Sequence, residues 1–84
     1  MSLYNTEIII VSFNTKRLIQ NCLESIEKST SGHNIKITIV DNGSTDGSIQ
    51  LIQEKFPHIN LIQIEKNIGY GAAMNVGIKS SKKE

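Results

Sequence analysis

Three short apolar segments of the chain have the composition of β-strands. Residues 7–12 contain four consecutive β-branched side chains, Ile8 to Val11. Such a run is typical of a strand that is buried on both faces, because a half-exposed strand would alternate apolar and polar positions. Residues 35–40 and 59–64 are also rich in branched apolar side chains, interrupted by one or two polar residues each. The sequence therefore predicts three strands.

The segment after the first strand has the period of an amphipathic helix. Over residues 15–28, apolar side chains recur on one helical face and polar side chains occupy the other. Asn14 or Thr15 is the expected N-cap, because either side chain can accept from the free N–H groups of the first turn. The side chains predicted to face the core are Leu18, Ile19, Cys22, Leu23 and Ile26.

Two further helices are predicted after the second and third strands. A short one spans residues 49–56 and stops at Pro57, which cannot continue a helix. Residues 65–71 are expected to form a loop, and a third helix runs from there toward residue 84. Its predicted core positions are Ala72, Ala73, Val76 and Ile78.

Strands and helices thus alternate three times in a single α/β domain of 84 residues, βαβαβα. This order implies a three-stranded parallel sheet whose strands are joined by right-handed crossover helices. Such sheets bind ligands beyond the carboxyl ends of their strands. The loops after residues 12, 40 and 64 are therefore the places to look for chemistry.

Charge and cysteine content narrow the class of protein. The formal net charge is +1 with mixed acids and bases, so we expect no nucleic-acid partner. The single cysteine, Cys22, forms no internal disulfide and fits a reducing compartment. The longest apolar run is far shorter than a membrane span of about 20 residues. We expect a cytoplasmic protein.

The first two loops carry an aromatic ring and a carboxylate. Phe13 follows the first strand, where it is either part of the core or a flat surface for stacking a nucleobase. Asp41 ends the second strand, where its carboxylate either caps the loop or accepts from the ring N–H of a pyrimidine. Leaving that carboxylate unpaired with the wrong base would cost about 1–3 kcal/mol.

The third loop, residues 67–75, is rich in small residues at the start of a helix. Gly69 and Gly71 either let an anionic ligand approach the backbone or serve the turn and close helix packing. They do not form a dinucleotide fingerprint, because Met74 replaces the third glycine and the loop follows the third strand. A P-loop is excluded, because no Gly-Lys-Ser/Thr occurs.

Taken in order, three motifs resemble the opening of the family 2 glycosyltransferases. They are IIIVSFN at residues 8–14, IVDNGSTDGS at residues 39–48 and NIGYGAAMNVGI at residues 67–78. The chain most resembles the branch that includes bacterial rhamnosyltransferases. The resemblance covers residues 7–78, and the middle motif is the most specific.

The resemblance implies a glycosyltransferase A-type fold in which residues 1–84 form the Rossmann-like, N-terminal nucleotide-sugar-binding subdomain. It places Ser12 and Phe13 against the base and lets Asp41 accept from the pyrimidine. Asn67, Gly69 and Asn75 would line the nucleotide side of the cleft. The implied donor is a UDP- or dTDP-sugar, and the implied acceptor is a glycan or a lipid-linked acceptor in cell-envelope polysaccharide assembly. The full-length parent protein would act in the cytoplasm, at the inner face of the membrane.

The sequence departs from the family pattern in two respects. Met74 stands where many members have a basic residue. The family also holds its divalent metal, Mg²⁺ or Mn²⁺, through an Asp-x-Asp motif, which this sequence lacks. We expect that motif, and the catalytic base, beyond residue 84. The chain alone should then bind no metal and be inactive; the alternative is a stand-alone nucleotide-binding module without catalysis.

The resemblance has a consequence for assembly. In the family the first strand lies inside the sheet, next to the fourth. A three-stranded piece would leave the Ile8–Val11 segment at an edge, where another chain can pair with it. Self-association through this edge is therefore expected.

Overall fold

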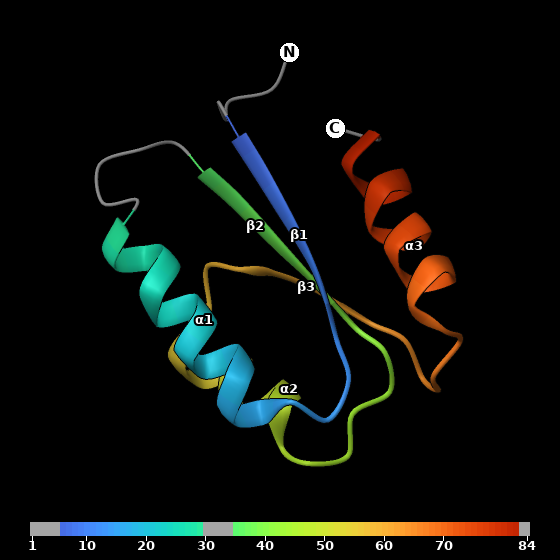
Figure 1. The fold of residues 1–84 in the computed structure, drawn as a ribbon, viewed down its shortest axis with the longest axis horizontal. Coiled ribbons are helices and arrows are strands. Elements are labelled where there is room, and N and C mark those ends of the chain that lie inside the picture. Colours follow the sequence, from blue (N-terminus) through green and yellow to red (C-terminus); the bar gives the residue numbers. More distant parts are fainter. Residues whose placement is uncertain (1–5, 30–34, 83–84) are drawn as a thin grey trace.

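The fold is a three-stranded parallel sheet with helices on both faces (Figure 1). The structure is a computed structural model that describes residues 6–29 and 35–82. The elements follow in the order β1 (Thr6–Ser12), α1 (Lys16–Ser29), β2 (Ile35–Asp41), α2 (Ser48–Lys55), β3 (Asn60–Gln63) and α3 (Tyr70–Lys82). The strand order is β1-β2-β3, and both pairings are parallel. The predicted α/β architecture is confirmed.

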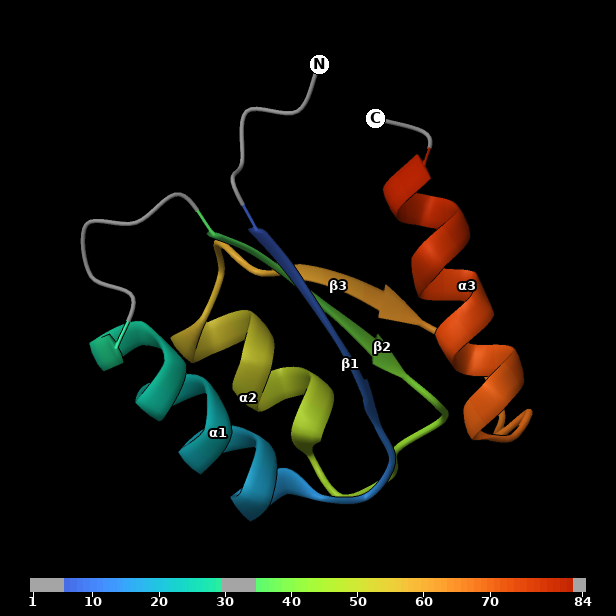
Figure 2. The same cartoon turned by 45° about the horizontal axis from the view of Figure 1, so that its top comes forward.

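The helices form two layers around the sheet (Figure 2). α1 and α2 lie on one face, because two right-handed crossovers that step across the sheet in the same direction place their helices on the same side. α3 turns back over the other face and contacts β1 and β2. β1 is thus an edge strand of the sheet formed by the described residues, as predicted.

The main core lies between the sheet and the α1–α2 layer. It is built from branched aliphatic side chains of the strands and the inner faces of both helices, with one aromatic ring from the end of α2. Its buried members are Ile19, Leu23, Ile37, Ile39, Leu51, Ile52, Phe56 and Ile59. Burial of this apolar surface is the main favourable contribution to folding.

The buried stripe of α1 is narrower than predicted. Ile19 and Leu23 are buried, but Leu18 is 69% exposed and Cys22 is exposed, so their prediction as core residues was wrong. At 3.6 residues per turn, Leu18 and Cys22 are rotated by about 60–100° from Ile19 around the helix axis. That rotation carries them past the surface covered by the sheet and α2.

α3 packs on the sheet through its smallest residues. Ala73 and Gly77 are buried, whereas Ala72 is exposed and Ile78 is 38% exposed, which corrects their prediction as core positions. A Cβ placed on Gly77 would come within 2.7 Å of Ile9 Cγ2. The helix approaches the sheet so closely that a glycine, rather than the larger Ile78, occupies the contact.

Element boundaries agree with the predictions to within a residue or two. β3 is shorter than expected, because Ile59 belongs to the turn before it, where its N–H donates to the Phe56 carbonyl (3.1 Å). α3 starts at Tyr70, inside the predicted loop. In the part of the chain that the structure describes, no helix has the length and hydropathy needed to cross a membrane.

Candidate functional site

The loops that follow the three strands meet at the carboxyl edge of the sheet. Ser12 and Asp41 are the last register pair of β1 and β2, and both are buried. The Asn42 N–H donates to the Ser12 carbonyl (2.7 Å), and the Ile64 N–H donates to the Asp41 carbonyl (2.8 Å). The backbone around Asp41 is therefore fixed by both neighbouring segments.

The Asp41 carboxylate is buried and only half satisfied. Its Oδ2 accepts from the Ser44 N–H (2.8 Å), which is the local capping contact that the sequence left open. Its Oδ1 is fully buried and has no hydrogen-bond partner among the described residues. Buried polar atoms are nearly always paired, because an unpaired one loses its hydration without compensation. Oδ1 is thus a buried hydrogen-bond acceptor without a donor among the described residues.

The two residues at the end of β1 differ in exposure. Ser12 is 2% exposed, and its hydroxyl pairs with the Thr15 hydroxyl (3.2 Å), so its side chain is engaged within the protein. Phe13 is 42% exposed. The interpretation of Phe13 as a core residue is therefore wrong, and its role as a stacking surface stays a prediction.

The loop after β1 is tied directly to the loop after β2. The Asn14 N–H donates to the Ser44 hydroxyl (2.9 Å), and the Thr45 N–H donates to Asn14 Oδ1 (2.8 Å). Asn14 adopts a left-handed backbone conformation (φ 49°), which asparagine tolerates better than most residues. These bonds join two segments that are about thirty residues apart in the sequence.

Asp46 caps two helices at once. Its Oδ2 accepts from the Lys16 N–H (3.0 Å) at the start of α1, and its Oδ1 accepts from the Ser48 N–H (3.0 Å) at the start of α2. Thr15 stands directly before α1, at the predicted N-cap position, and its carbonyl accepts from the Ile19 N–H (2.8 Å). The Asn14 and Thr15 side chains bond instead to the Thr45 N–H and to the Ser12 hydroxyl. The hydrogen bond from the Ser48 hydroxyl is the main reason that the pKa of Asp46 is lowered. Desolvation is the next largest effect and raises the pKa, and the hydrogen bonds from the backbone N–H groups of Lys16 and Ser48 lower it further.

Asn42 anchors the third loop and was missed among the predicted site residues. Its Nδ2 donates to Asn67 Oδ1 (3.1 Å) and to the Gly69 carbonyl (3.3 Å), and its Oδ1 accepts from the Ile68 N–H (3.0 Å). Asn67 Oδ1 also accepts from the Gly69 N–H (2.7 Å). The available signal in the sequence was its place directly after the second strand, and the structure shows that it is 2% exposed.

The remaining predicted residues lie on exposed parts of the third loop and α3. Gly69 has a left-handed backbone (φ +87°), and a Cβ placed on it would meet no atom within 4 Å. Its surface is therefore open to an approaching ligand. Asn75 is exposed on α3, and Met74 beside it is half-buried. The structure brings Ser12, Phe13, Asp41, Asn67 and Gly69 to the three loops of one sheet edge.

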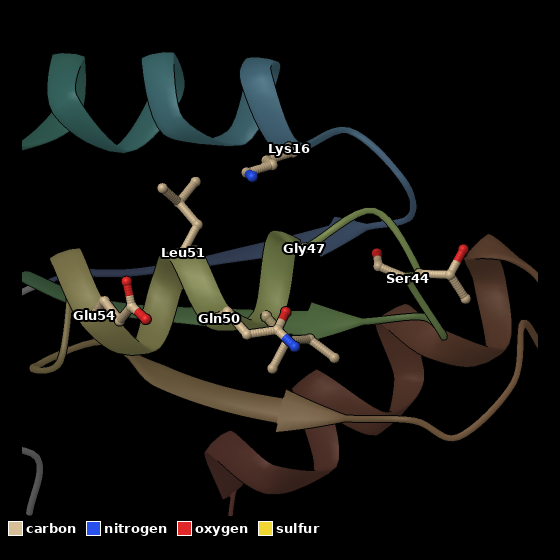
Figure 3. A pocket seen from close by; sticks show the side chains of 8 residues that line it. Lys16, Ser44, Gly47, Gln50, Leu51 and Glu54 are labelled. Carbon is tan, nitrogen blue, oxygen red and sulfur yellow. The ribbon is translucent and has the colours of Figure 1, made fainter.

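A hollow of about 500 Å³ lies beside this edge, between the start of α1 and α2 (Figure 3). Lys16 and Leu51 extend into the space between the two helices. None of the six predicted site residues lines the hollow, although Ser44 does. We place the candidate site at Asp41 rather than in the hollow, because the unpaired buried acceptor is there and the hollow contains no comparable group.

The described residues offer no metal site of their own. No three His, Cys, Asp or Glu side chains gather closely enough among them to hold an ion. The two aspartates of the chain, Asp41 and Asp46, are engaged with the backbone N–H groups of Ser44, Lys16 and Ser48.

Comparison with known proteins gives the family of the chain. The family model described as glycosyl transferase family 2 matches residues 7–84. The chain belongs to glycosyl transferase family 2. Relatives within this range include EpsH of Bacillus subtilis, which is 34% identical over 79 residues covering 92% of this chain.

Two further relatives were found, one by sequence and one by structure. The N-acetylglucosaminyl-diphospho-decaprenol L-rhamnosyltransferase of Mycobacterium tuberculosis is 29% identical over 68 residues, covering 81% of this chain and 22% of the relative. A mannosyltransferase from Pyrobaculum calidifontis, solved in complex with GDP-Man and Mn²⁺, has the same fold with a TM-score of 0.71 at 22% identity, covering 89% of this chain and 24% of its own. The chain spans about a quarter of the length of such relatives, 23% in the case of EpsH.

Proposed function

We propose that this chain binds the nucleotide of a UDP- or dTDP-linked sugar, as the N-terminal nucleotide-sugar-binding part of a longer glycosyltransferase. The observation that supports this most strongly is the buried, unpaired Asp41 Oδ1 at the carboxyl edge of the sheet. A ligand donor at that position would recover a hydrogen bond whose absence costs about 1–3 kcal/mol. The ring N–H of uracil or thymine is such a donor.

The residues around Asp41 supply the other contacts that a nucleotide needs. Phe13 offers an exposed ring on which a base can stack, and stacking on an aromatic side chain contributes about 1–3 kcal/mol per base. Ser12 lies beside it at the strand end. Asn67, Gly69 and Asn75 would face the ribose and phosphates, and the open backbone at Gly69 allows their close approach.

Base binding at Asp41 requires a small rearrangement. Because Oδ1 has almost no accessible surface, a ring N–H can reach it only if a neighbouring side chain moves aside. Phe13, whose side chain is 42% exposed, directly follows Ser12, the residue that pairs with Asp41 in the sheet. We expect the Phe13 side chain to change rotamer as the base enters, and its ring then to stack against the base.

The transfer reaction itself would use groups outside these residues. A divalent cation, Mg²⁺ or Mn²⁺, neutralises the leaving diphosphate in such chemistry and requires oxygen ligands. The acceptor would be a glycan or a lipid-linked glycan, as the name of the mycobacterial relative suggests. We expect the 84-residue chain alone to transfer no sugar, and metal-dependent transfer from UDP- or dTDP-sugars by the purified chain would contradict this.

Nucleotide binding is tested by calorimetric titration of the chain with UDP and CDP. The two ligands have the same size and charge, but cytosine carries a lone pair where uracil carries the ring N–H. We expect UDP to bind about 5–150-fold more tightly, which corresponds to about 1–3 kcal/mol. Equal affinities, or no binding of either ligand, would overturn the proposal.

The Asp41→Asn variant makes the test specific to this residue. The Ser44 N–H holds the oxygen of the side chain, so the amide nitrogen of the variant falls where Oδ1 lies in the native chain. A donor there opposes the uracil N–H and complements the cytosine lone pair. We therefore expect the variant to bind CDP at least as well as UDP.

A further inference from the structure

Ser44 makes hydrogen bonds to both segments that carry the proposed base contacts. Its N–H donates to Asp41 Oδ2 (2.8 Å). Its hydroxyl accepts from the Asn14 N–H (2.9 Å), which belongs to the peptide that directly follows Phe13. A single residue therefore touches the carboxylate acceptor on one side and the aromatic segment on the other.

The surrounding contacts hold Ser44 in a fixed place. The Thr45 N–H donates back to Asn14 Oδ1 (2.8 Å), so the two loops are joined by a reciprocal pair of bonds. Gly43 before it has a left-handed backbone (φ +90°) and packs against the backbone of Lys66 and Asn67. Neither loop can shift far without breaking one of these contacts.

The two bonds of Ser44 have separate consequences. Its N–H occupies one carboxylate oxygen and leaves Oδ1 as the acceptor for a ligand. Its hydroxyl fixes the peptide after Phe13 and so limits where the ring can lie. We infer that Ser44 is a positioning residue for base recognition, which holds the Asp41 acceptor and the Phe13 ring in one spatial relation. This inference rests on the proposed nucleotide binding.

The hydroxyl can be removed without touching the N–H. Ser44→Ala deletes the bond to Asn14 and keeps the bond to Asp41, whereas Ser44→Thr restores a hydroxyl. Thr45→Ala is the matched control, because it removes a neighbouring exposed hydroxyl that bonds to none of the described residues. Affinities for UDP and CDP are measured for the native chain and all three variants.

We expect Ser44→Ala to weaken UDP and CDP alike, by about three- to tenfold, because the Phe13 segment is released while the Asp41 acceptor stays in place. The UDP-to-CDP ratio should stay unchanged, unlike in Asp41→Asn. Ser44→Thr and Thr45→Ala should bind both nucleotides within about twofold of the native chain, which is near the error of such comparisons.

The inference is wrong if Ser44→Ala binds like the native chain, if Ser44→Thr fails to restore affinity, or if the loss falls on UDP alone. A native chain that binds no nucleotide overturns the proposed function and this inference with it. Amide hydrogen exchange gives a readout without nucleotide: the Asn14 N–H should exchange faster in Ser44→Ala than in Thr45→Ala, and Ser44→Thr should restore its protection. Equal exchange in the alanine variants contradicts the role of the hydroxyl.

Discussion

Gly43 and Gly69 share a left-handed backbone conformation but differ in what surrounds them. A Cβ on Gly43 would lie 2.9 Å from Lys66 Cα and 3.0 Å from the Asn67 N, whereas a Cβ on Gly69 would meet nothing within 4 Å. Only the first position therefore combines conformational strain with a backbone clash. Side-chain rotation cannot relieve that clash, because the atoms in contact belong to the main chain.

The pair provides a controlled test of loop packing. We expect Gly69→Ala to lower the free energy of unfolding by about 1 kcal/mol, the usual cost of alanine at positive φ. Gly43→Ala should lose a further 1–3 kcal/mol or so through overpacking. Urea denaturation measures both values, and similar losses in the two variants would contradict the close approach of the β2–α2 and β3–α3 loops.

Asp46 should make stability depend on pH in a defined direction. Because its pKa is lowered in the folded chain, its contribution is fully present above the unfolded pKa of about 3.9 and is lost as pH falls through the lower, folded pKa. The difference in unfolding free energy between the native chain and Asp46→Asn should therefore be constant near neutral pH and shrink below about pH 4. A difference that stays the same down to strongly acid pH would contradict the double cap.

Most of the site could be predicted from single residues, and its internal bonding could not. Asp41 and Phe13 stand out because a carboxylate and a ring follow buried strands at the edge where such sheets bind ligands. The roles of Asn42, Ser44 and Asp46 depend on partners about three to thirty residues away, which spacing along the chain does not specify. For the same reason the sequence suggested local caps for α1 where Asp46 acts from another loop.

At the scale of elements, the strands were easier to predict than the helix faces. A run of β-branched residues defines a buried strand to within a residue or so, because both of its faces are covered. A helix buries only the stripe that its neighbours cover, and Leu18 and Ile78 show that apolar residues also lie outside that stripe. In α3 the surface that contacts the sheet is formed by Ala73 and Gly77. Because these residues are small, they do not stand out in the hydrophobic pattern of the sequence.

The packing of α3 can be tested at two glycines of the same helix. A Cβ on Gly77 would meet Ile9 Cγ2 at 2.7 Å and Val40 Cγ2 at 3.0 Å, and β-branched side chains have little rotamer freedom to yield. Gly77→Ala should lose about 1–2 kcal/mol of unfolding free energy even after the gain of roughly 1 kcal/mol from helix propensity. Gly71→Ala, where nothing lies within 4 Å, should be neutral or stabilising.

Thermal and urea unfolding of the two variants distinguishes packing from propensity. If α3 sits as closely on β1 and β2 as the Gly77 contacts indicate, only Gly77→Ala is destabilised. Stabilisation of both variants would mean that the helix lies farther from the sheet. Nucleotide affinity need not change in Gly77→Ala, because Gly77 lies on the face of α3 that packs on β1 and β2 rather than in the loops of the site.

At the scale of the whole molecule, the open edge of β1 is the main unpaired feature. β1 pairs only with β2 among the described residues, and Ile8, Ile9, Ile10 and Val11 are all only partly buried. A chain of 84 residues also buries a modest share of its surface and has a thin margin of stability. An edge strand of this composition is a template for pairing with another chain.

We expect the 84-residue chain to self-associate through this edge. Sedimentation equilibrium over a wide concentration range should show a mass that rises above that of the 9.3 kDa monomer. Amide exchange of the β1 N–H groups should slow as the associated fraction grows, because pairing protects them. A mass equal to that of the monomer at every concentration would contradict this expectation. It would mean that the edge of β1 does not pair with another chain.

The most direct test of the central claim is the position of a bound base. In a solution of the chain with UDP, nuclear Overhauser contacts from the uracil H5 and H6 protons report which side chains surround the ring. We expect contacts to the Phe13 ring, because the proposed base stacks on it while its ring N–H, on the edge opposite H6, faces Asp41. Contacts instead to Leu51 and Gln50, which line the hollow between α1 and α2, would contradict a base site at the carboxyl edge of the sheet.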